Sequence, residues 1–274
     1  MINIMVKKVM LVTGASSGIG KACAEYFSEK SWCVYGSSRS IKNSDSYKFH
    51  SLTMDVKEDQ SVKEGIKCIL KNEGRIDVVI NCAGTGIIGA FEDTAIEEAK
   101  SQFETNFFGV HRVCKEVIPV MRGQSSGFLI MISSLAGLSS YPFLGFYSAS
   151  KFALEGISEA IRMELKPFGI EVVLIEPGTF HTNLSVNSVR TKDSLTRTTY
   201  KKRLENALNM TAKAEAKAPD LIIIPRLIDK IMNKRIAPRL RYKTGLLSEK
   251  FGMIIKKLIP YKLYEYIMMK AIGI

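Results

Sequence analysis

Short apolar, β-branched runs alternate with helix-length amphipathic stretches between residues 8 and 176 of this chain. Strands are predicted at 8–13, 33–37, 50–54, 77–81, 127–133 and 170–176, and helices at 19–30, 59–72, 94–121 and 147–167. Several of the strand runs are apolar at nearly every position, which is typical of strands that are covered on both faces. The alternation predicts βα units, a parallel sheet and an α/β fold.

The alternation ends at about residue 180. The next stretch, about 180–220, is polar and helix-prone without a strong apolar stripe, and predicts a helical lid over a site. The segment 221–231 fits either a helix kinked at Pro225 or a short strand followed by a helix. The helix is favoured by five apolar residues at helical spacing, Leu221, Ile224, Leu227, Ile228 and Ile231.

The last thirty residues have an amphipathic pattern. We therefore expect one domain over 1–244 and a basic tail over 245–274, with an apolar stripe of Leu247, Phe251, Ile254, Ile255 and Leu258. The net charge of the chain is +12, and residues 191–274 alone account for it with 19 Lys and Arg against 7 Asp and Glu. The stripe is predicted to pack on the domain or on another subunit of a homo-oligomer. The alternative is a peripheral contact with a membrane surface.

Several classes of protein are disfavoured by the sequence. The five cysteines are odd in number and lack paired C-x-x-C spacing, so we expect neither a disulfide framework nor a metal site, and a reducing, cytoplasmic location. We expect no signal peptide and no membrane-spanning helix, because the apolar runs are too short. The basic last third has no recognisable nucleic-acid-binding motif, so nucleic acid is not an expected partner.

The first predicted strand leads directly into "TGASSGIG", Thr13 to Gly20, at the start of a helix. Glycines permit a tight turn and a close approach of a pyrophosphate to the backbone N–H groups of a helix N-terminus. The motif therefore predicts a dinucleotide site, with contacts from Gly14, Ser16, Ser17, Gly18, Ile19 and Gly20.

The second predicted strand ends in "GSSRS". In a doubly wound sheet this end of the strand faces the adenosine ribose, where an acidic residue would bind the 2′-hydroxyl of NAD. Here Ser38 and Arg39 stand in that place, and a guanidinium suits a 2′-phosphate. The predicted cofactor is NADP(H).

"TGASSGIG", "NCAG" (81–84), "YSASK" (147–151) and "EPGTFHT" (176–182) together resemble the short-chain dehydrogenase/reductases. The similarity covers about residues 8 to 185, and within the family it is greatest to 17β-hydroxysteroid, retinol and acyl-dihydroxyacetone-phosphate reductase relatives. It implies a single Rossmann-type domain, with a doubly wound parallel sheet in three αβα layers. Many members carry a second asparagine within "NCAG"; this chain keeps only Asn81.

The resemblance also implies a catalytic set of Asn106, Ser134, Tyr147 and Lys151. Hydride exchange between a carbonyl and an alcohol needs a proton at the oxygen, and Tyr147 and Lys151 are one helical turn apart. We expect the lysine to favour the phenolate of Tyr147. Ser133 competes with Ser134 as the serine that binds the reacting oxygen, and spacing favours Ser134. Further cofactor contacts are implied for Asp55, Val56, Asn81, Ala83, Gly84, Tyr147, Lys151, Pro177, Gly178, Thr179 and Thr182.

These observations predict an NADP(H)-dependent oxidoreductase that interconverts a ketone or aldehyde and an alcohol. The segments 84–91, 135–146 and 180–220 are predicted to form the substrate pocket, and the apolar, aromatic "LSSYPFLGF" favours a lipophilic substrate of the steroid, retinoid or keto-lipid kind. The alternative is a non-catalytic nucleotide-binding or sensor protein on the same fold.

Overall fold

The computed structural model describes residues 7–41, 47–181, 189–196 and 199–271. Seven strands form one parallel sheet in the order β3-β2-β1-β4-β6-β7-β9. Their bounds are β1 Val9–Thr13, β2 Cys33–Ser38, β3 His50–Thr53, β4 Val78–Asn81, β6 Gly127–Ile132, β7 Ile170–Pro177 and β9 Arg241–Thr244. The order reverses between β1 and β4, and the sheet is the doubly wound, Rossmann-type sheet that the sequence predicts.

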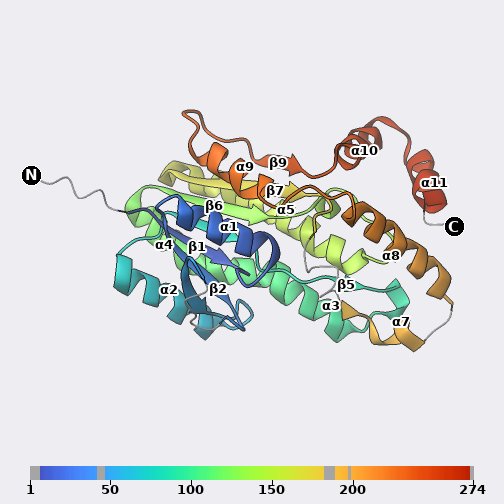
Figure 1. The fold of residues 1–274 in the computed structure, drawn as a ribbon, viewed down its shortest axis with the longest axis horizontal. Helices are drawn as coiled ribbons and strands as arrows, with labels where there is room; N and C mark the ends of the chain where they lie inside the picture. Colours follow the sequence, from blue (N-terminus) through green and yellow to red (C-terminus); the bar gives the residue numbers. More distant parts are fainter. Residues whose placement is uncertain (1–6, 42–46, 182–188, 197–198, 272–274) are drawn as a thin grey trace, which may run out of the picture.

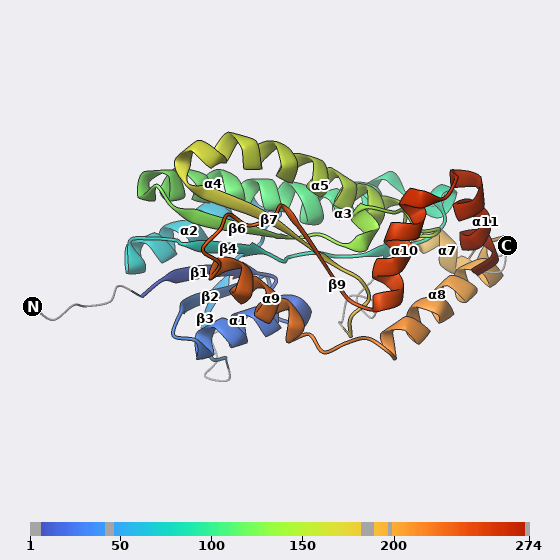
Figure 2. The ribbon, with the colours of Figure 1, turned by 90° about the horizontal axis from the view of Figure 1, so that it is seen from above.

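Helices cover both faces of the sheet, which gives three αβα layers (Figure 2). One face is covered by α2 (Asp59–Glu73), α4 (Gly109–Gln124) and α5 (Gly145–Leu165), and the other by α1 (Gly18–Glu29) and α9 (Ile223–Met232). Successive residues of β1 alternate between the two cores: Val9 and Leu11 face the first set of helices, and Met10 and Val12 the second. Both faces are therefore apolar, as the sequence pattern requires.

The predicted helix over 94–121 is wrong as one continuous helix. The structure has α3 (Ile96–Phe103), a π-helical turn η2 (Glu104–Phe108) and then α4. A π turn inserts an extra residue into the helical ladder, and Asn106 lies in it. The helix predicted near 221–231 is confirmed as α9, where Pro225 is in the first turn and no intrahelical N–H bond is lost. The short strand β9 was not predicted.

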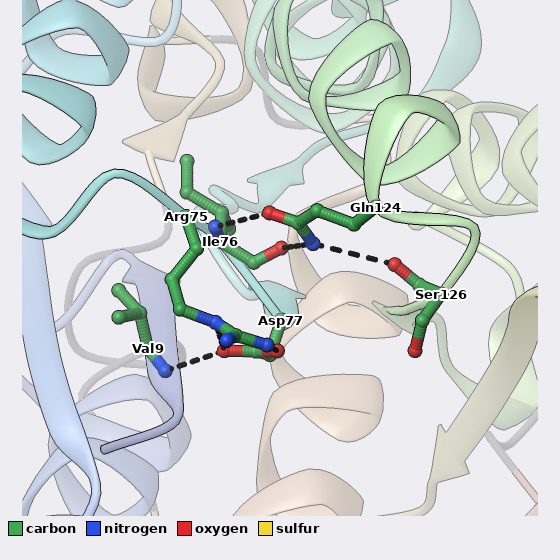
Figure 3. Close-up of polar contacts among 6 residues, drawn as sticks. All are labelled: Val9, Arg75, Ile76, Asp77, Gln124 and Ser126. Carbon is green, nitrogen blue, oxygen red and sulfur yellow. Dashed lines mark hydrogen bonds and ion pairs between the residues drawn. The ribbon is translucent and has the colours of Figure 1, made fainter. Parts of the chain in front are cut away.

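Polar contacts connect the amino ends of the central strands, at the edge of the sheet where they begin (Figure 3). The Asp77 carboxylate accepts hydrogen bonds from the backbone N–H of Val9 at 2.8 Å and from the Arg75 guanidinium at 3.0 and 2.6 Å. The Gln124 side chain bonds both backbone groups of Ile76, at 3.0 and 2.9 Å. These bonds fix β1, α4 and the start of β4 at the edge opposite to the carboxyl ends.

The remaining elements lie at the carboxyl ends of the strands, toward one end of the molecule (Figures 1 and 2). They are β5 (Ile87–Ile88), η1 (Phe91–Asp93), η3 (Leu135–Gly137), β8 (Val189–Arg190), α7 (Lys192–Thr196), α8 (Lys201–Glu215), α10 (Leu247–Leu258) and α11 (Tyr261–Ala271), while η4 (Lys166–Phe168) follows α5. β5 and β8 form a second, two-stranded sheet. The described part of the predicted lid is thus helical except for β8, and the division of the chain at residue 244 stays a prediction.

Candidate active site

The glycine-rich turn connects β1 to α1 next to the point where the strand order reverses. Gly14 has a φ of +71°, and a Cβ built on it would lie 2.8 Å from the Cα of Ala83. A Cβ on Gly20 would lie 2.3 Å from the carbonyl oxygen of Gly14. Ser17, the N-cap residue, provides no side-chain cap to α1. The turn therefore requires glycine, and the N–H groups of the first turn of α1 lack a side-chain cap, an arrangement that favours anions at helix N-termini.

Thr13 joins the two central strands beneath this turn. Its hydroxyl accepts hydrogen bonds from the backbone N–H groups of Cys82 and Ala83, both at 3.0 Å. These bonds hold the segment after β4 against the glycine-rich turn. The sequence places Thr13 in the motif but gives no sign of this partner, because the two segments are about seventy residues apart.

Arg39 is exposed just beyond the end of β2, and within the described ranges it has no hydrogen bond or ion pair. The neighbouring Ser38 hydroxyl accepts a bond from the N–H of Ile41 at 3.0 Å and so shapes the turn. Asp55 follows β3 and accepts from the N–H of Lys57 at 2.9 Å. Among the described residues at this corner, Arg39 is a cation without a side-chain partner.

Tyr147 is half-buried in the first turns of α5, and Ser134 follows β6. Burial raises the pKa of the Tyr147 phenol, and a hydrogen bond with the Ser134 hydroxyl lowers it in part. Ser134 also caps η3 by accepting from the N–H of Ala136 at 3.1 Å. The Ser133 hydroxyl is buried without a partner among the described residues. The geometry favours Ser134, as the spacing does, and the tyrosine remains protonated at neutral pH.

Lys151 is 6% exposed on the same helix. Its ammonium donates a hydrogen bond to the carbonyl oxygen of Ile132 at 2.8 Å and lies 5.9 Å from the centre of the Tyr147 ring. Burial lowers the pKa of Lys151 to about 8. The two head groups do share a face. However, burial is the largest influence on Tyr147, so its pKa is raised rather than lowered as expected from the lysine.

Asn106 connects the π turn to α5, the helix that carries Tyr147 and Lys151. Its side chain accepts from the N–H of Thr85 at 2.9 Å, and donates to the Thr85 carbonyl and to the Ser150 hydroxyl, both at 3.1 Å. Ser150 in turn donates to the carbonyl of Tyr147 at 2.7 Å. A Cβ on Gly84 would lie 3.5 Å from the Asn106 oxygen and 4.0 Å from the Lys151 ammonium. Asn106 is therefore close to the predicted catalytic residues.

Asn81 points away from this cluster. It is 3% exposed at the end of β4, and its amide donates to the sulfur atoms of Met131 at 3.3 Å and Cys114 at 3.6 Å. Its side chain therefore belongs to the core, and any contact with a cofactor would use its backbone. Val56 is also buried, 7% exposed, and packs against Gly109.

The segment after β7 is hydrogen-bonded to α10, which was not predicted. The backbone N–H of Thr179 donates to the Glu249 carboxylate of α10 at 3.0 and 3.1 Å, and the Thr179 hydroxyl donates to it at 2.6 Å. The N–H of Gly178 donates to the carbonyl of Thr244 at 2.7 Å, and the Pro177 carbonyl accepts from Ser134 at 3.4 Å. The predicted cofactor residue Thr182 lies outside the described residues.

The three segments predicted to form the substrate pocket lie together. The rings of Phe91 and Phe146 stack 5.6 Å apart, and Phe143 meets Tyr200 of the lid edge to face at 6.2 Å. The N–H of Gly89 donates to the carbonyl of Phe143 at 3.0 Å. These contacts thus bring aromatic side chains of the three segments together.

A buried acidic pair lies behind the catalytic helix. Glu176 of β7 is 0% exposed, and Glu155, one turn after Lys151 on α5, is 5% exposed. Arg241 of β9 donates to Glu155 at 2.8 Å and lies 3.6 Å from Glu176. Burial, followed by the charge of Glu155, raises the pKa of Glu176 to about 7. This cluster could not be predicted from the sequence, because β9 was not predicted.

Within the ranges that the structure covers, no group of three His, Cys, Asp or Glu side chains is placed to hold a metal ion. In the same ranges, each helix is too short or too polar to cross a membrane.

Known proteins resemble this chain in sequence and in structure. A sequence profile described as short chain dehydrogenase matches residues 8–193. The chain is 39% identical over 263 residues to 3-ketodihydrosphingosine reductase of Bacteroides thetaiotaomicron, covering 96% of this chain and 97% of that protein. A short-chain dehydrogenase from Streptomyces avermitilis has a TM-score of 0.81 at 29% identity, with 95% and 98% of the two chains covered.

A second solved structure supports the fold alone. A short chain dehydrogenase/reductase from Burkholderia phymatum in complex with NAD has a TM-score of 0.78 at 20% identity, with 92% of this chain and 93% of that one covered.

Proposed function

We propose that this chain, which belongs to the short-chain dehydrogenase family, is an NADP(H)-dependent oxidoreductase. It would interconvert a ketone and an alcohol on a lipophilic substrate. The family consists of oxidoreductases that act on CH–OH groups and bind NAD(P). The observation that carries the proposal is the cluster of Ser134, Tyr147 and Lys151 beside a glycine-rich turn.

The residues around the turn fit a dinucleotide. A Cβ at Gly14 or Gly20 would fill the space beside the backbone, and the first turn of α1 has no cap from Ser17. Lys151 is proposed to hold the nicotinamide half, together with Thr179 if it exchanges its bonds to Glu249 for the cofactor, and Arg39 is proposed to hold a 2′-phosphate. When bound, the nicotinamide supplies or accepts the hydride.

Tyr147 is proposed to give the proton to the carbonyl oxygen during reduction. Its raised pKa keeps the phenol protonated at neutral pH, which suits a proton donor. Ser134, whose hydroxyl influences the pKa of the phenol, would orient the same oxygen. Lys151, with a pKa of about 8, would carry a positive charge near the phenolate as it forms and so reduce the cost of proton release.

The proposed substrate is a keto-lipid. The relative at 39% identity is named for the reduction of 3-ketodihydrosphingosine, and it matches this chain over nearly its whole length. The aromatic side chains of Phe91, Phe143 and Phe146, in the segments predicted to form the pocket, would suit a long apolar chain. A 3-keto long-chain base is therefore the first substrate to test.

The test measures oxidation of NADPH and of NADH with 3-ketodihydrosphingosine, together with the dissociation constants of both cofactors. We expect turnover with tighter binding of NADPH. Tyr147→Phe should lower the rate by about 10²–10⁴-fold with little change in cofactor binding. The control is Tyr26→Phe on α1, which removes a hydroxyl that binds Asp229 and should leave the rate unchanged. Near-normal turnover by Tyr147→Phe would overturn the mechanism, and equal dissociation constants would overturn the assignment of NADP.

A further inference from the structure

Helix α10 has two different faces. The inner face packs on the domain: Met253 is 6% exposed, Glu249 bonds Thr179, and the Lys256 ammonium donates to the carbonyl of Leu138 at 2.8 Å. These three residues are spaced three and four apart, and so form one side of the helix. This side fixes α10 beside the active site.

The opposite face of α10 is an exposed apolar stripe. Its four members lie at positions i, i+4, i+7 and i+11, and their side chains are largely exposed: Leu247 79%, Phe251 62%, Ile254 52% and Leu258 77%. Leu247, Phe251 and Ile254 also line a shallow hollow of about 450 Å³. The stripe therefore does not complete the core. A contiguous exposed apolar surface of this kind marks a contact with another molecule or with a membrane.

Helix α11 extends this surface after Pro260. Tyr264 holds it to the domain through a 2.6 Å hydrogen bond with the Ser139 hydroxyl. Its other side exposes Leu263 at 47%, Tyr266 at 61% and Ile267 at 46%. We call the exposed apolar side chains of α10 and α11 the C-terminal platform.

The charges beside the platform indicate what covers it. Residues 247–271 contain five lysines and two glutamates. One of the two glutamates, Glu249, is hydrogen-bonded to Thr179 on the inner face. By helical spacing, Lys250 and Lys257 flank the stripe on the same side. In a two-fold contact between copies of this chain, each copy would present the same lysines, and like charges would oppose the contact. An anionic surface would instead attract them.

We propose that the C-terminal platform binds the surface of an anionic lipid bilayer. Exposed leucine, isoleucine and phenylalanine would enter the boundary between headgroups and acyl chains, tyrosines would lie at headgroup depth, and lysines would contact anionic headgroups. The platform is fixed in place by the rest of the fold, so the helices need not fold on binding.

The platform lies at the same end of the molecule as the lid helices α7 and α8 (Figures 1 and 2). Its inner face bonds Thr179, Leu138 and Ser139, which belong to the segments that follow β7 and β6 beside the catalytic residues. Docking would therefore bring the active site close to the bilayer. Entry of a lipophilic substrate from the bilayer rests on the proposed function. Binding of the platform to the bilayer does not depend on it.

The experiment sediments the full chain with vesicles, without cofactor or substrate, so its outcome is independent of whether the enzyme reduces a keto-lipid. We expect binding to vesicles of phosphatidylcholine with phosphatidylserine at low salt, weaker binding as salt rises, and little binding to phosphatidylcholine alone. Lys250→Gln with Lys257→Gln should weaken binding about 30-fold, since each lysine near an anionic surface contributes a factor of about five. The matched control is Lys67→Gln with Lys71→Gln, two exposed lysines on α2.

A second pair of variants tests the apolar side chains. Phe251→Ser with Leu258→Ser should reduce binding about ten-fold or more, whereas Ile96→Ser with Met163→Ser, at positions 59% and 68% exposed elsewhere, should not. Thermal unfolding checks that each variant is folded. The proposal is wrong if the unmodified chain ignores anionic vesicles at low salt. It is also wrong if the Phe251 and Leu258 changes dissociate an oligomer and leave vesicle binding unchanged, because the platform is then a subunit interface.

Discussion

Replacing Glu176 by glutamine should make this protein more stable at high pH and change little at low pH. Glu176 has no exposed surface, and its carboxylate faces Glu155, with Arg241, Lys243 and Lys257 as the surrounding cations. Burial and the second carboxylate raise its pKa, which disfavours the ionised form in the folded protein. Glutamine keeps the shape of the side chain and removes the charge.

The magnitude follows from the difference in pKa between the two states. The ordinary value is 4.5 and the folded value about 7, and each pKa unit corresponds to about 1.4 kcal/mol. Between these values the folded state keeps a proton that the unfolded chain has lost, so stability falls as pH rises through this window. The loss in free energy of unfolding caused by Glu176 reaches about 3 kcal/mol above pH 7 and is absent below pH 4.5.

Urea unfolding of the wild type and of Glu176→Gln at about pH 5 and about pH 8 measures this cost. The free energy of unfolding of the variant should exceed that of the wild type by less than about 1 kcal/mol at the lower pH and by about 3 kcal/mol at the higher. Glu159→Gln is the control, because Glu159 bonds the same Arg241 at 2.8 Å but its side chain is 57% exposed. Parallel stability profiles for wild type and Glu176→Gln between the two pH values would refute the reasoning.

Three further predictions concern the cofactor site. Gly14→Ala should lower the free energy of unfolding by about 1–3 kcal/mol through its positive φ and its contact with backbone, whereas Gly156→Ala, with open space around it, should not destabilise in urea titrations. Arg39→Ala should raise the dissociation constant of NADPH about ten- to hundred-fold and leave that of NADH unchanged; equal weakening would contradict the role of Arg39. Glu249→Ala should lower the melting temperature because three donors of Thr179 and Leu246 lose their acceptor, and Glu265→Ala, exposed on α11, should not.

Much of the sheet could be predicted because its signals are local. Six strands agree with their predicted bounds to within two residues. Except for β3, "HSLT", which is partly exposed, each is a short, largely apolar run. β9, "RYKT", carries no such run. It is a strand because its register with β7 pairs Tyr242 with Ile175, a relation between distant segments. The break in the helix at Asn106 likewise depends on a partner far along the chain, Ser150.

The candidate site divides in the same way. The glycine-rich turn, the Tyr147 and Lys151 pair and Arg39 were predictable, because their chemistry depends on residue type at short spacing. The surroundings that set the pKa values and the orientations of the site residues could not be predicted. The direction of the pKa change at Tyr147 was wrong, since burial outweighs the neighbouring lysine, and the side chain of Asn81 points into the core.

The sequence by itself determined the fold class and the family and predicted which residues transfer the proton, because periodicity and motif spacing act over a few residues and need no knowledge of the rest of the chain. Only the tertiary structure decided which face of α10 is buried, that Glu249 bonds Thr179 seventy positions away, and that Glu155 and Glu176 share Arg241. The apolar stripe of the tail has the same helical spacing whether it is buried or exposed. Its exposure follows from the inner face, where Glu249, Met253 and Lys256 find their partners and turn the stripe outward.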